Sequence, residues 1–101
     1  MCGILRGMRH KQMREPIVDV TIGDTHYEIW MLRIPRANKR IEITMYMIIN
    51  KEGKEEVWDR SLVFDMDDRK RNQNIHSVLT ALFKVKHIKD EDVIWNIINQ
   101  Q

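Results

Sequence analysis

The stretch IEITMYMII, residues 41–49, decides the fold of this chain of 101 residues. Every second side chain in it, beginning with Ile41, belongs to an isoleucine or a methionine. The side chains between them are those of Glu42, Thr44, Tyr46 and Ile48. Such alternation predicts an antiparallel β-strand with one buried face. The rest of the chain therefore has to supply neighbouring strands and a layer that covers the apolar face.

Three further segments of strand-like composition flank this stretch. We expect four strands, over residues 17–22, 26–34, 40–50 and 56–65. Turn-forming residues separate them at 23–25, at 36–39 and at 51–54, and Pro35 should end the second strand. Because these connections are short, successive strands should pair antiparallel as a meander.

The periodicity becomes helical after Met66. One helix face is formed by Ile75, Val78, Leu79, Leu82 and Phe83. Two residues are candidates for the N-cap of this helix, Asp67 and Asn72. A second helix should begin near Asp90, where three successive acidic residues suit a helix N-terminus. Its apolar stripe comprises Val93, Ile94, Ile97 and Ile98.

The predicted fold is an α+β domain of order ββββαα: a four-stranded antiparallel β-meander followed by two C-terminal helices packed on one sheet face. Residues 16–101 form this single domain. Residues 1–15 are rich in Arg, Lys, Gln and Met without periodicity, and we interpret them as a basic N-terminal arm.

Composition bounds the possible classes of protein. The 17 basic and 15 acidic residues nearly balance, so charge alone does not indicate a nucleic-acid partner. The single cysteine, Cys2, excludes an intramolecular disulfide, and with the seven methionines it favours a reducing compartment. No apolar run approaches the ~20 residues of a membrane span, and no secretory signal is recognisable. We therefore expect a cytoplasmic protein.

Catalytic and metal-binding motifs are missing from the sequence. The histidines, His10, His26, His76 and His87, lack the close spacing of zinc ligands. The acidic group at residues 65–68 lacks the glycine and terminal glutamate of an EF-hand. Phosphate-binding loops and nucleophile motifs are also missing. We expect no metal, no cofactor and no enzymatic activity.

The opening residues Met1-Cys2-Gly3-Ile4 resemble the start of class II glutamine amidotransferases. In that family the cysteine exposed by methionine removal is the nucleophile, and the resemblance would assign this role to Cys2. It covers four residues, and no later motif of the family follows. We interpret Cys2 as an incidental free thiol.

The sequence of the second strand does not decide which of its two sides is buried. Either Trp30, Leu32 and Ile34 face the core, with Tyr27, Ile29, Met31 and Arg33 outside, or the reverse holds. We prefer the first arrangement because its inward set is the more apolar. The outer sheet face would then combine Tyr27 and Tyr46 with Ile29, Met31 and Ile48. The basic residues Arg33, Arg36, Lys39 and Arg40 would lie at one edge of that face.

Such a face is too apolar to be fully solvated, and three alternatives for its cover stay open. It is an interface with a protein partner or a second copy, a stacking platform for single-stranded nucleic acid, or a face covered by the first sixteen residues. The order of a four-stranded meander and a helix resembles that of Whirly and Pur-type single-strand binders. Trp95, which lies off its helix stripe, is either a partner anchor or a packing residue.

We predict a small non-enzymatic binding protein, a regulator or inhibitor that acts through a protein–protein interface, of a kind typical of viral or mobile-element regulators. The alternative is a single-stranded nucleic-acid-binding protein that uses an aromatic and basic sheet face. The candidate partner-binding residues are Tyr27, Ile29, Met31, Arg33, Arg36, Lys39, Arg40, Tyr46 and Trp95.

Overall fold

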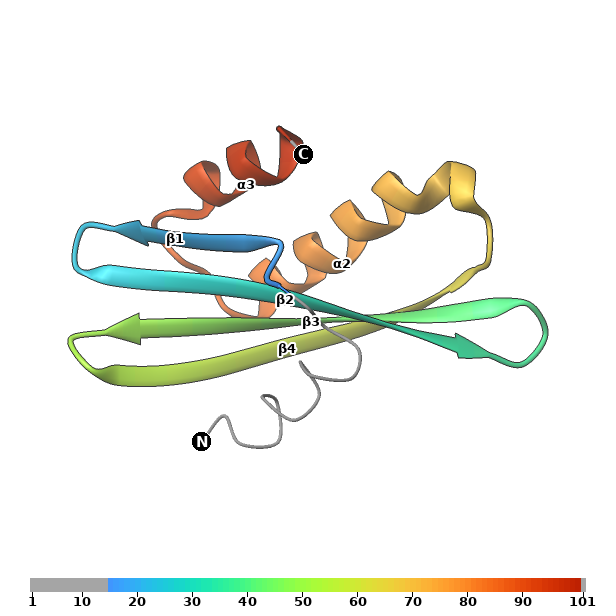
Figure 1. Ribbon diagram of the computed structural model, residues 1–101, viewed down its shortest axis with the longest axis horizontal. Helices are drawn as coiled ribbons and strands as arrows, with labels where there is room; N and C mark the ends of the chain where they lie inside the picture. The colour runs from blue at the N-terminus through green and yellow to red at the C-terminus, as the bar shows by residue number, and fades with distance from the viewer. Residues whose placement is uncertain (1–14, 101) are drawn as a thin grey trace.

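Four antiparallel strands and two α-helices make up the fold in a computed structural model that describes residues 15–100. The elements are β1 (Val18–Ile22), β2 (Thr25–Arg36), β3 (Arg40–Lys51), β4 (Lys54–Asp65), the 3-10 turn η1 (Asp68–Lys70), α2 (Arg71–Val85) and α3 (Glu91–Asn99). The strands form one sheet in the order β1-β2-β3-β4, and both helices lie along one side of it (Figure 1). The predicted ββββαα order is confirmed. Cys2 and nearly all of the predicted arm lie outside the described residues.

The second strand is longer than predicted. β2 continues through Pro35 to Arg36, and Pro35 lies opposite Ile41 of β3. β1 pairs only with residues 25–29 of β2, so Pro35 stands on a part of the strand that has a single neighbour within the described sheet. A proline, which lacks the backbone N–H, is tolerated at such an edge.

The loop between β2 and β3 determines which face of β2 is buried. Arg36 pairs with Arg40, so the loop has three residues, and Asn38 and Lys39 in it have φ values of 62° and 54°. With this register Tyr27, Ile29 and Met31 lie opposite Ile49, Met47 and Met45. The preferred orientation of β2 was therefore wrong. A four-residue turn at 36–39 would shift the pairing by one residue, which turns every β2 side chain to the other face.

The main core lies between one sheet face and the two helices. From the sheet it contains Val18, Tyr27, Ile29 and the alternate isoleucines and methionines of β3. From the helices it contains Val78, Leu79, Leu82, Phe83, Ile94 and Ile98. The stripe predicted for the first helix is confirmed in α2. In α3 the stripe is narrower, because Val93 is 42% exposed.

The acidic residues before the two helices have different roles. The Asp67 carboxylate accepts a hydrogen bond from the Arg69 backbone N–H at 3.1 Å, so it caps η1, which precedes α2. Asp90 is the N-cap residue of α3, yet its side chain makes no capping hydrogen bond. Its carboxylate instead accepts a hydrogen bond from the Tyr27 hydroxyl at 2.7 Å, which joins α3 to the centre of the sheet.

The two-residue loop between β3 and β4 yields a test of the turn chemistry. Glu52 and Gly53 have φ values of 53° and 82°, as a type I′ turn requires, and asparagine followed by glycine suits this turn best. We expect Glu52→Asn to raise the free energy of unfolding by about 0.5–1 kcal/mol, measured by urea denaturation. The same change at Glu55, inside β4, should give no gain. An unchanged or less stable Glu52→Asn variant would show that this turn is not the one formed.

Candidate interaction surfaces

The sheet face away from the helices holds a second apolar cluster. Trp30, Leu32 and Ile48 are 5%, 3% and 3% exposed, and Ile34 and Tyr46 pack against them. Neither α2 nor α3 contributes to this cluster, since their buried residues all belong to the main core. The alternative in which residues 1–16 cover this face concerns a segment that lies outside the described residues, apart from its last two.

Carboxylates surround this second cluster. Glu28 accepts a hydrogen bond from the Trp30 indole N–H at 2.8 Å. Tyr46 lies opposite Asp59 in the β3–β4 pairing. Burial raises the pKa of the Tyr46 hydroxyl, and the nearby negative charges of Asp59 and Glu42 raise it further. Arg36 forms an ion pair with Glu42 on this face, so Glu28 and Asp59 supply the negative charge that remains beside the apolar centre. This charge favours basic ligands over phosphate groups.

Four of the predicted partner-binding residues lie on the other side of the sheet. Tyr27, Ile29 and Met31 face the helices, and Tyr27 and Ile29 are only 3% and 0% exposed. Arg33 continues the same side of β2 and is half-buried. Because Tyr27 and Tyr46 are on opposite faces, the predicted stacking platform that combined them does not form.

Tyr27 is buried in the main core, where its hydroxyl bonds to Asp90. Burial raises the pKa of its hydroxyl to about 12, and the hydrogen bond to Asp90 contributes to the rise. A neutral phenol that donates to a carboxylate is the stable state of this pair at physiological pH. The pair therefore fixes the position of α3 relative to β2.

β4 presents an exposed strip that the sequence did not reveal. It pairs only with β3 within the described sheet, and the register points Glu55, Val57, Asp59, Ser61, Val63 and Asp65 away from the helices. Val57 and Val63 are 45% and 54% exposed. We call these six residues the β4 strip. Its two valines alternate with carboxylates, and it contains no basic residue.

The opposite side of β4 faces the helices and is partly covered. Trp58, Leu62 and Phe64 all pack against the main core. The Lys86 ammonium lies 5.3 Å from the centre of the Trp58 ring. The Trp58 indole N–H donates to Glu56 at 2.9 Å, and this bond, with Lys86 nearby, lowers the pKa of Glu56.

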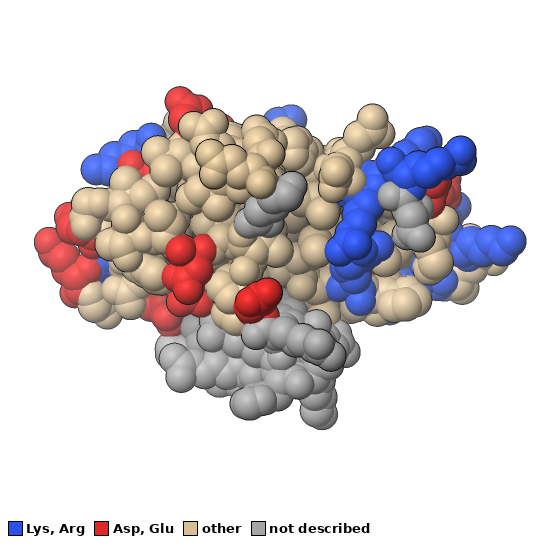
Figure 2. Space-filling model, turned by 45° about the horizontal axis from the view of Figure 1, so that its top comes forward, with Lys and Arg blue, Asp and Glu red and all other residues tan. Residues whose placement is uncertain are grey.

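Basic residues from two distant segments meet at one end of the molecule (Figure 2). Arg36, Lys39 and Arg40 come from the β2–β3 hairpin, and residues 69–71 come from η1 and the start of α2. A hydrogen bond of 2.9 Å from the Met66 backbone N–H to the Lys39 carbonyl oxygen holds the second segment beside the first. We call these six residues the basic end. The sequence indicated only its hairpin half.

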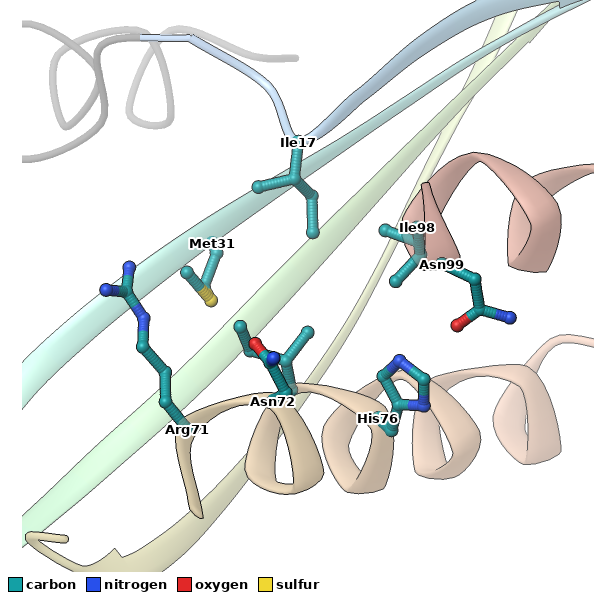
Figure 3. Close-up of a pocket in the computed structure, with 8 residues that line it drawn as sticks. Ile17, Met31, Arg71, Asn72, His76, Ile98 and Asn99 are labelled. Carbon is teal, nitrogen blue, oxygen red and sulfur yellow. The ribbon is translucent and has the colours of Figure 1, made fainter. Parts of the chain in front are cut away.

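Two grooves flank the first turn of α2. One, of about 460 Å³, is lined by Arg40, Val63, Phe64, Asp65, Lys70 and Asn74. The other, of about 400 Å³, lies between α2 and α3 and has an apolar floor that includes Met31. Figure 3 shows Arg71, Asn72 and His76 along α2 at this second groove, with Asn99 of α3 opposite them. Both grooves therefore carry polar groups from the helix start.

Trp95 packs inside the helical layer. Its ring meets Phe83 edge-on, with ring centroids 5.8 Å apart, and meets His76 at 5.3 Å in the same way. Trp95 is half-buried against the main core. The predicted alternative of internal packing accounts for its position off the stripe, whereas a role in binding a partner stays a prediction.

Metal-ligand clusters and membrane-spanning helices are both absent from the described part of the chain. Residues 15–100 contain no group of three His, Cys, Asp or Glu side chains placed to hold a metal ion. Across the same residues, each helix is too short or too polar to cross a bilayer. No family model, no curated protein and no solved structure matches the chain.

The Tyr27–Asp90 hydrogen bond yields a stability prediction. Tyr27→Phe removes the donor, and we expect the free energy of unfolding at pH 7 to fall by about 1–2 kcal/mol in urea denaturation. Because folding raises the pKa of Tyr27 from 10.0 to about 12, the contribution of this group is complete below pH 10. It is lost as the pH rises from 10 through 12, since the unfolded chain ionises first.

The variant lacks this component, so its stability should decline less than that of the wild type between pH 9 and 11. A decline as steep as that of the wild type would show that Tyr27 is not the group responsible.

Proposed function

We propose that this chain is a small non-enzymatic binding protein that regulates another protein by docking an extended, basic segment of it along β4. The observation that carries the proposal is the β4 strip, where Val57 and Val63 are about half exposed and carboxylates flank them. Exposed apolar side chains framed by charges of one sign are typical of a surface that recognises a partner.

The edge position of β4 supplies the mode of binding. A strand with one neighbour presents a row of backbone N–H and C=O groups to which an extended segment can add as a further strand. β4 is twelve residues long, and the backbone N–H and C=O groups of every second residue point away from β3. Alternate side chains of the added strand would meet the β4 strip, so lysines or arginines opposite Asp59 and its neighbours would give specificity.

A second copy of the chain is a less suitable occupant than a different protein. Antiparallel pairing of β4 with itself, in the register that sets Val57 against Val63, also sets Glu55 against Asp65 and Arg60 against Arg60. Like charges directly opposite each other destabilise a strand pair. We therefore favour a basic segment of another protein over the homodimer.

Nucleic-acid binding on the sheet face is the weaker alternative. The two tyrosines of the predicted platform lie on opposite faces, and the carboxylates of Glu28 and Asp59 lie beside the remaining aromatic groups. A phosphate backbone laid on this face would meet charges of its own sign.

The β4 strip is tested with two matched double variants. Val57→Lys with Val63→Lys places two cations on the strip, and Val85→Lys with Val93→Lys adds the same charge at valines of similar exposure on the helices, 41% and 42%. We expect quantitative affinity capture from the native cell to recover a partner with the wild type and with the helix variant. The strip variant should recover at least about tenfold less, because like charges then oppose the basic segment. Equal recovery by both variants would contradict the proposal.

The occupant is tested by two further measurements. The full chain should sediment as a monomer, and a chain that begins at Glu15 should bind the captured partner with the same affinity as the full chain. A dimer that the strip variant dissociates would identify a second copy as the occupant and overturn the proposal. Binding only by the shortened chain would likewise overturn it, because the first fourteen residues would then compete for the strip.

A further inference from the structure

We propose that the basic end binds the backbone of a single-stranded nucleic acid, with one unpaired base held against Phe64. The inference uses a different surface from the β4 strip and does not depend on the proposed protein partner. It also differs from a sheet-face platform, since the residues that carry it come from the β2–β3 hairpin, the end of β4 and the start of α2.

Four of the six cations at the basic end are available to an anion. Arg36 is paired with Glu42, and Arg69 lies 3.3 Å from Asp67. Within residues 15–100 no ion pair forms with the other four, which are all exposed: Lys39, Arg40, Lys70 and Arg71. Unpaired basic side chains drawn together from two segments form the footprint of a polyanion.

One groove combines two of these cations with an aromatic ring. Arg40 of β3 and Lys70 of η1 line the groove of about 460 Å³, and the half-buried Phe64 lines the same groove. Single-strand binders pair an aromatic side chain, on which a base stacks, with cations that follow the phosphates. A duplex keeps its base faces covered, so a ring in a groove of this kind selects unpaired bases.

The remaining polar residues of this groove suit the same ligand. Asn74 offers an amide that donates and accepts hydrogen bonds, as base edges require. Asp65 repels a phosphate but accepts a hydrogen bond from a base N–H group, such as the N3–H of thymine. The phosphates are therefore expected on the side of Arg40 and Lys70, and the strand would continue past the start of α2 to Arg71.

The charge component is tested by fluorescence anisotropy with a labelled oligothymidylate of about twenty nucleotides at low and rising salt. Three or four phosphate contacts predict a slope of log affinity against log salt of about −2 to −3. Arg40→Gln with Lys70→Gln should weaken binding about tenfold and flatten the slope by about 1.4. Lys84→Gln with Lys89→Gln removes the same charge in the last turn of α2 and in the loop after it, and binding should stay within about twofold of the wild type.

The base component is tested with Phe64→Leu, which retains apolar packing but removes the stacking face. We expect affinity for the oligothymidylate to fall about fivefold or more, with binding of inorganic polyphosphate unchanged. Thermal unfolding followed by circular dichroism checks that each variant is folded. No binding of the oligonucleotide at low salt, or equal weakening by the two double variants, would overturn the proposal. A duplex of the same length that binds as tightly as the single strand would overturn it as well.

Discussion

The pairing register between β2 and β3 is the constraint on which the rest of the structure depends. It turns Tyr27 and Ile29 towards the helices and Trp30 towards the opposite face. With Tyr27 inward, its hydroxyl reaches Asp90 and fixes the start of α3. The same register leaves the other face with an apolar centre surrounded by carboxylates. The layers and the chemistry of both sheet faces thus follow from one three-residue loop.

The sequence was sufficient to predict the buried face of each element whose two sides differ in polarity. The alternation in β3 and the helical stripe of α2 each have one apolar side, so their buried faces follow from composition alone. β2 has apolar residues on both sides, and the orientation preferred for it was wrong. The deciding feature was the left-handed backbone of Asn38 and Lys39, which sets the loop length. Asparagine favours this conformation, but nothing in the composition indicates it for Lys39.

The interaction surfaces could be predicted only where their residues are close together in the sequence. The cations of the hairpin lie close together in the sequence and were identified from it. Residues 69–71 join them through the fold, since the chain returns along β4 and Met66 bonds to Lys39. The β4 strip was not predicted for another reason: Trp58 and Leu62 on one side of the strand make it resemble any half-buried strand. The predicted meander already makes β4 an edge, but only the fold shows that Val57 and Val63 are exposed there.

The three tryptophans occupy three chemically distinct places, and this gives the molecule built-in optical reporters. Trp30 belongs to the cluster on the helix-free face, Trp58 lies beneath the Lys86 ammonium on β4, and Trp95 stacks edge-on against an imidazole between the helices. In variants that retain only one of the three tryptophans, the fluorescence would therefore report on one known part of the fold. A ligand that quenches or shifts one emission and leaves the other two unaltered would be located on the fold without any attached dye.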